Sequence, residues 1–226
     1  MDWNLVISRN HALLLRIVAE LFAMARIVEG GTSFALPRHL YNAIMLILRP
    51  AESAIRRLVI IAARGLVLKT RASRSTAAGL ASFSGAALTR TPVFRLIDPL
   101  KQFGPGVCDQ EIDPVSFFHP ADDLDPELAW QRAQFADAPV DATLLFNRLR
   151  AMRLALNDLP RQARRLARWQ ARKNLALAGK TRPMRLSPFR PGLPPGYHKQ
   201  HRHKVDHVLR DVHYFAREAW NNPDSS

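Results

Sequence analysis

Arginine side chains between residues 161 and 172 carry the chemistry that the sequence marks most clearly. Five of them recur at spacings of three and four residues, so a helix would gather them on one face. This arginine stripe consists of Arg161, Arg164, Arg165, Arg168 and Arg172. A planar guanidinium binds phosphate or carboxylate oxygens through two parallel hydrogen bonds. Trp169 and Lys173 border the stripe and add a stacking surface and a further cation. The pattern predicts a surface that binds phosphate groups.

The chain as a whole is strongly basic, with 33 lysine and arginine residues, 19 acids and a formal net charge of +14. No acid occurs between Asp158 and Asp206, a span that holds 13 of the bases. Neutralising phosphates with several arginines releases bound counterions, which favours DNA or RNA as the partner. Phe189 and Tyr197 add aromatic rings within this span. Because no zinc-finger spacing, helix-turn-helix or RNA-binding aromatic signature is present, we expect binding without sequence preference.

A second interpretation of the arginine stripe needs no external partner. The stripe would then be a solvated face, or it would pair with the chain's own acids, each surface ion pair contributing little to stability. The acids that would take part lie between Lys101 and Arg132, where no base occurs. They are Asp109, Glu111, Asp113, Asp122, Asp123, Asp125 and Glu127. Pairing of this acidic stretch with the stripe would weaken any binding of phosphates.

In two further interpretations, the protein is a structural or adaptor protein. The proline-rich segment from Arg182 to Pro195 is expected to be extended, and it would dock on an acidic or aromatic-lined groove of a protein partner. The stripe helix would otherwise lie on an anionic membrane surface. Its opposite face is only weakly apolar, which disfavours the membrane. That face consists of Ala163, Leu166, Ala167, Gln170 and Leu177.

No pattern in the sequence indicates an enzyme, a cofactor or a metal. Five histidines cluster near the end of the chain, but neighbouring bases would oppose a cation, and a basic patch that charges at mild acidity is favoured. These are His198, His201, His203, His207 and His213. Cys108 marks no nucleophile pair, and Gly104-Pro105-Gly106 lacks the spacing and lysine of a phosphate loop. One cysteine, no clear signal peptide and no apolar span together predict a cytoplasmic protein.

Apolar periodicity predicts an all-α fold in which an N-terminal helical hairpin bundle carries long irregular linkers and a basic C-terminal helical region. We expect helices over 3–28, 37–48 and 50–68, with Pro50 opening the third. A short helix over 126–135 and a longer one over 141–178, kinked at 157–160, should follow. A last helix over 203–220 would dock through Val205, Leu209, Val212 and Ala216.

Composition divides the chain into four parts. Residues 1–68 form the helical core, and residues 69–125 form an irregular linker with an acidic end. Residues 126–178 are the helical region with the arginine stripe, and 179–226 are a basic, proline-rich arm with the last helix. Within the linker, the apolar run from Pro92 to Ile97 is predicted to clip onto the helices as an extended segment.

Two stretches carry a resemblance to known sequences. They are LRPAESAIRRLVIIAARGL, from Leu48 to Leu66, and RPGLPPGYHKQHRHKVDHVL, from Arg190 to Leu209. Together they are similar to a family of bacterial proteins without an assigned function. The resemblance covers about a fifth of the chain. It implies a bacterial cytoplasmic protein and transfers no catalytic or binding residue.

Overall fold

The protein is mostly helical, as the sequence predicts. The computed structural model describes residues 2–25, 35–66, 68, 92–100, 139–178 and 187–222. This part of the chain contains five helices and one two-stranded sheet. The predicted helix at 126–135 and the acidic stretch at 109–127 lie outside the described residues. Among those described, no helix is both long and apolar enough to cross a lipid bilayer.

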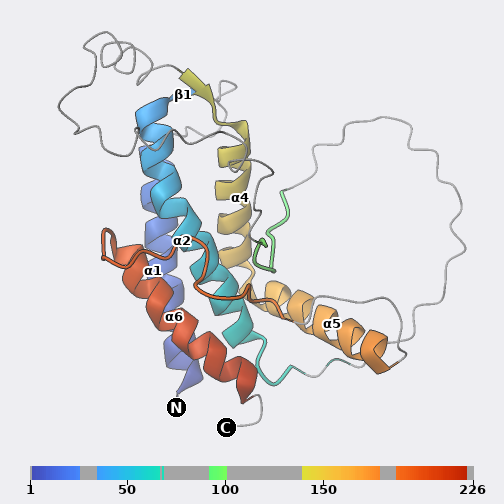
Figure 1. Cartoon of the computed structure of the whole chain (residues 1–226). Coiled ribbons are helices and arrows are strands. Elements are labelled where there is room, and N and C mark those ends of the chain that lie inside the picture. Colours follow the sequence, from blue (N-terminus) through green and yellow to red (C-terminus); the bar gives the residue numbers. More distant parts are fainter. Residues whose placement is uncertain are drawn as a thin grey trace, which may run out of the picture.

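Four helices form a bundle and a fifth leaves it. Helices α1 (Trp3–Met24), α2 (Arg38–Ala62) and α6 (Lys204–Asn221) lie together, with α4 (Thr143–Asn157) along one side (Figure 1). Helix α5 (Leu159–Ala178) continues from the end of α4 and runs obliquely away from the bundle (Figure 1). Asp158 separates α4 from α5 within the predicted kink, and its carboxylate caps α5 by accepting from the N–H of Arg161 at 3.1 Å.

Helix α2 is the centre of the fold and contacts all four other described helices. The prediction of two helices separated at Pro50 is wrong, because α2 runs without interruption from Arg38 to Ala62 with Pro50 inside it. Its apolar face continues through the proline, and burial on both sides of Pro50 outweighs the one hydrogen bond that a proline cannot donate. The buried residues of this face include Ile44, Leu48, Ala51, Ile55 and Leu58.

Two short strands that the sequence did not predict close one end of the bundle. Strand β1 (Ala35–Pro37) pairs antiparallel with β2 (Pro139–Asp141), and Leu36 lies opposite Val140. The carboxylate of Asp141 then accepts hydrogen bonds from both the backbone N–H and the hydroxyl of Thr143. This pairing fixes the beginning of α4 next to the beginning of α2.

Two irregular segments pack on the helices and complete the core. Phe94 and Leu96 of segment 92–100 are buried, so the predicted apolar run does pack against the bundle. Loop 187–203 crosses α2 at Pro50, where Ser53 Oγ donates to the carbonyl of Pro195 at 2.6 Å. Gly196 fits there because its φ is +75° and a Cβ atom would lie 2.5 Å from the Pro50 nitrogen. Helix α6 follows, capped by His203 and Asp206.

Candidate functional site

The arginine stripe lies on the face of α5 that points away from the protein. The opposite face is buried and is formed by Gln162, Ala163, Leu166 and Ala167. Since consecutive helical residues are about 100° apart, the stripe is centred roughly 180° from this buried face. Four of its five arginines are exposed. They form an exposed arginine row consisting of Arg161, Arg164, Arg168 and Arg172, which spans about 16 Å along the axis.

Three of the seven predicted contact residues do not join this row. Arg165 is half-buried, and its Nη1 atom donates to the carbonyl of Phe94 at 3.1 Å and to Gln162 Oε1 at 2.7 Å. Trp169 is half-buried and packs against the core. The Lys173 ammonium lies between two indoles, 5.9 Å from the ring centre of Trp169 and 5.6 Å from that of Trp220. These three side chains therefore attach α5 to the rest of the fold.

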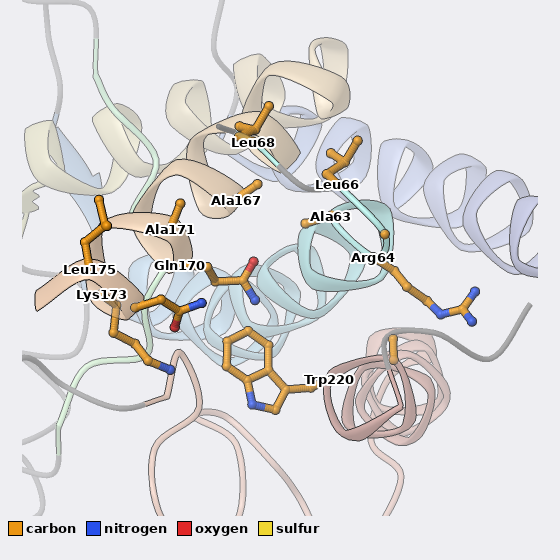
Figure 2. Close-up of a pocket in the computed structure, with 13 residues that line it drawn as sticks. Ala63, Arg64, Leu66, Leu68, Ala167, Gln170, Ala171, Lys173, Leu175 and Trp220 are labelled. Atoms are coloured by element: carbon orange, nitrogen blue, oxygen red, sulfur yellow. The ribbon is translucent and has the colours of Figure 1, made fainter. Parts of the chain in front are cut away.

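A pocket of about 690 Å³ lies beside Lys173, between α5 and the ends of α2 and α6. In Figure 2, Gln170, Lys173 and Trp220 are directed toward the same hollow, whereas the Arg64 guanidinium points away from it. That guanidinium lies 4.6 Å from the ring centre of Trp3 instead. No acid lines the pocket among the described residues. The charged residues of its described lining are therefore all cations.

A buried ion cluster joins α2 to segment 92–100 and to α4. It consists of Glu52, Arg56 and Arg57 on α2, Asp98 in segment 92–100 and Arg148 on α4. Asp98 accepts from Arg57 at 2.6 and 3.0 Å through its two carboxylate oxygens, and from Arg56 at 3.4 Å. Glu52 accepts from Arg148 at 2.8 and 3.0 Å and from Arg56 at 3.2 Å. Each acid therefore bridges two arginines.

Burial and charge act in opposite directions on the acids and bases of this cluster. Burial alone would raise the pKa of Asp98, but the hydrogen bond from Arg57 and the charges of Arg57 and Arg56 outweigh it, so the pKa is lowered. For Arg56, burial lowers the pKa despite the opposing charges of Glu52 and Asp98. Asp98 is thus ionised at neutral pH and supplies the counter-charge that two buried guanidinium groups need.

His213 of α6 extends the cluster as a neutral ring. Burial first, and the charges of Arg57 and Arg217 next, lower the pKa of His213 to about 4. Its Nδ1 atom can therefore accept the hydrogen bond that Arg57 Nε donates at 3.1 Å. The Phe189 ring packs 4.7 Å from the Arg57 guanidinium, and the backbone N–H of Arg190 donates to Asp98. Loop 187–203 is thus anchored to the cluster.

A pocket of about 620 Å³ opens above the ion cluster, between segment 92–100, α2 and α4. Glu52, Arg56, Asp98 and Arg148 contribute to it, together with the exposed residue Arg95. Its other walls are mainly apolar. They are formed by residues that include Pro92, Val93, Phe94, Ile97, Leu144 and Leu145.

The C-terminal histidines take separate structural roles. His198 Nδ1 lies 3.0 Å from Asp206, His203 caps α6, and the rings of His201 and His207 stack with their centres 3.8 Å apart. Within the described part of the chain, no three histidine, cysteine or acidic residues gather as metal ligands would. The aromatic residues proposed for base stacking are also used internally, since Phe189 contacts Arg57 and Tyr197 lies under Arg210.

Sequence reasoning found the arginine stripe but missed the ion cluster. The pairing of Glu52 with Arg56 could be expected, because the two residues are four apart on a helix. The adjacent Arg56 and Arg57 were a further signal, since two charges inside an otherwise apolar helical face require buried partners. Nothing in the sequence identified Asp98 as that partner, because it is 41 residues away from Arg57.

Comparison with known proteins assigns no family to this arrangement. No family model, no curated protein and no solved structure matches the chain. The resemblance of 48–66 and 190–209 to a bacterial family consequently adds nothing to the site. The exposed arginine row, the ion cluster and the two pockets are the features from which a function has to be inferred.

Proposed function

We propose that the protein binds the phosphate backbone of DNA or RNA through the exposed arginine row of α5, without reading the base sequence. The observation that carries this proposal is the position of the row, which lies opposite the buried face of its helix. Helix α5 contains no acid, and none follows until Asp206. Four guanidinium groups on one open face favour a polyanion over a single small anion.

The length of the row suits a short run of nucleotides. Its span of about 16 Å corresponds to about five phosphates of one strand, at 3.4 Å per phosphate along a duplex. If four phosphates are neutralised, log K should fall against log salt with a slope of about −3.6 for a duplex and about −2.8 for a single strand. Weak binding at physiological salt is the expected regime for contacts to the backbone alone.

The other uses of this region gain less support from the contacts. The apolar face of α5 that a membrane would need is packed on the protein itself through Ala163, Leu166 and Ala167. The described part of the proline-rich arm, residues 187–195, also makes contacts within the protein. The carbonyls of Pro188 and Pro195 accept hydrogen bonds from the Asp98 N–H and the Ser53 hydroxyl. Docking on an acidic protein would use the same arginine row, so the test has to separate that partner from nucleic acid.

The test is fluorescence anisotropy with labelled 20-nucleotide DNA and RNA, single- and double-stranded, across a salt series. The variant replaces Arg161, Arg164, Arg168 and Arg172 by alanine. A matched control replaces Arg9, Arg49, Arg150 and Arg202, which are also exposed, so both proteins fall from a net charge of +14 to +10. We expect at least a tenfold loss of affinity in the row variant and a loss below about threefold in the control.

Equal losses in the two variants would mean that net charge, rather than the row, attracts the nucleic acid. Absence of binding at low salt would refute the proposal. Unlabelled poly-glutamate serves as a competitor: if it displaces RNA at the same charge concentration, the row is a docking surface for acidic chains in general, and the adaptor alternative takes precedence.

A further inference from the structure

The side chains that line the 620 Å³ pocket at the ion cluster carry more positive than negative charge, which favours an anionic ligand. Its lining includes three cations, Arg56, Arg95 and Arg148, and two acids, Glu52 and Asp98. Both acids already accept hydrogen bonds from arginine side chains. Asp98 accepts four hydrogen bonds and Glu52 accepts three, close to the capacity of a carboxylate. A cationic ligand would therefore find both carboxylates of the described lining already paired with arginine.

Donors, in contrast, remain available at the pocket. Arg148 binds Glu52 through Nε and Nη2, while its Nη1 atom meets Met45 Sδ at 3.5 Å, a weak acceptor. The Arg148 side chain is 36% exposed and lines the pocket. Arg95 lines the same pocket with an exposed side chain, and its backbone is held in place because Arg56 Nε donates to its carbonyl at 3.1 Å. An anion would meet two arginines here.

Two apolar side chains at the rim of the pocket face solvent. Leu144 is 76% exposed and Val93 is 68% exposed, and both line the pocket. Phe94, Leu145 and Ala151 continue the apolar wall toward the interior. A volume of about 620 Å³ falls within the range of small-molecule sites. The pocket thus combines a net positive charge with apolar walls and with apolar side chains at its mouth.

We propose that this pocket binds a small organic carboxylate with an apolar body. The carboxylate would bind the partly exposed guanidinium of Arg148 and the guanidinium of Arg95, and the apolar body would cover Leu144 and Val93. Burying these two rim side chains would add a hydrophobic contribution to the ionic one. The site is separate from the arginine row of α5, so the proposal stands whether or not the protein binds nucleic acid.

Isothermal titration calorimetry with octanoate tests the proposal, with octylammonium and octanol as probes of the same chain length. We expect octanoate to bind with a dissociation constant below about 1 mM, as suits a ligand of about ten heavy atoms, and at least tenfold more tightly than either comparison probe. Two-dimensional ¹H–¹⁵N spectra should then place the shifts in segment 92–99 and in α4 around Asn147 and Arg148.

Exposed positions supply variants that leave the core intact. Leu144→Glu puts an acid at the mouth and should weaken octanoate binding at least tenfold, and Arg95→Gln should weaken it severalfold. The control is Leu154→Glu on the same helix, where the side chain is 48% exposed and does not line the pocket, and it should bind like the native protein. Circular dichroism confirms that each variant is folded.

Several results would overturn the proposal. The proposal is wrong if octanoate does not bind at concentrations up to about 10 mM, roughly 5–10 times the expected dissociation constant. Binding of octylammonium or octanol as tight as that of octanoate would show that no cationic anchor operates. Equal losses in Leu144→Glu and Leu154→Glu, or shifts that map to the pocket at Trp220, would place the ligand elsewhere.

Discussion

A single carboxylate, that of Asp98, connects parts of the chain that are far apart in sequence. It accepts from Arg56 and Arg57 of α2 and from the backbone N–H of Arg190 in loop 187–203. Its side chain is completely buried, as is nearly all of Arg57. The desolvation of such charges is offset only while every partner is present, so loss of one partner costs more than the pair contributes.

Replacing Asp98 by asparagine should therefore lower the free energy of unfolding by about 3 kcal/mol, because two buried guanidinium groups lose their shared counter-charge. Urea unfolding followed by circular dichroism measures this change. Asp211→Asn is the control, since Asp211 is exposed on α6, and it should change the free energy of unfolding by less than about 0.5 kcal/mol. A similar small effect at Asp98 would mean that the cluster is not essential for stability.

Two glycines of loop 187–203 allow the cost of an unfavourable backbone conformation to be measured separately from the cost of a steric clash. Gly192 and Gly196 have φ angles of +79° and +75°, but a Cβ atom at Gly192 would have no neighbour within 4 Å, whereas at Gly196 it would overlap the backbone of Arg49 and Pro50. Gly192→Ala should therefore cost about 1–2 kcal/mol from conformation alone. Gly196→Ala should cost at least about 1 kcal/mol more. Equal costs in urea unfolding would show that the loop moves away from α2 without penalty.

Repulsion between the arginine side chains of α5 lowers the stability of that helix. Five pairs of stripe arginines are three or four residues apart, and each such pair destabilises a helix by about 0.2–0.5 kcal/mol. Helix α5 also contacts the rest of the fold on one side, while its exposed arginine row faces solvent. The arrangement suits a surface that becomes more stable when an anion covers it.

The alanine variant of Arg161, Arg164, Arg168 and Arg172 should consequently be more stable than the native protein, by about 1–2 kcal/mol at low salt, because all five pairs are removed. Thermal unfolding in 10 mM and in 1 M NaCl measures the difference. At 1 M NaCl the Debye length is about 3 Å, and the gap should largely close. If the variant unfolds at a lower temperature than the native protein at both salt concentrations, repulsion between these arginines does not destabilise α5.

At the scale of the whole molecule, α2 holds the fold together because it contacts every other described helix as well as segment 92–100 and loop 187–203. Its second half is buried almost without interruption from Ser53 to Ile61. The far end of α5, in contrast, exposes Arg172, Asn174 and Leu175. Stability should therefore be distributed unevenly among the helices.

Hydrogen exchange followed by mass spectrometry should show this gradient. Amides of 55–61 should exchange last, with protection close to the global free energy of unfolding, and amides of 172–177 should exchange first among the helices. Binding of RNA to the arginine row should slow the second group without affecting the first. Equal protection in both segments would indicate that α5 unfolds only together with the bundle.

Local periodicity predicts those helices whose apolar residues recur with helical spacing. Periodicity placed α1, α5 and α6, including the buried face of α6 at Val205, Leu209, Val212 and Ala216. It also placed the arginine stripe on one side of α5, because the spacing of three and four residues fixes a common face in any helix. These features depend on neighbours within one or two turns, which is information that a local pattern contains.

Contacts between distant parts of the chain, in contrast, depend on how the helices and loops pack together. The path of α2 through Pro50 depends on burial from several sides, and the pairing of Arg57 with Asp98 joins residues 41 positions apart. The contact of Ser53 with Pro195 spans 142 positions. Arg165, Trp169 and Lys173, which the sequence proposed as phosphate contacts, make contacts inside the fold with Phe94, the core and Trp220. Long-range packing selects such partners through shape and desolvation, and no spacing along the chain encodes either.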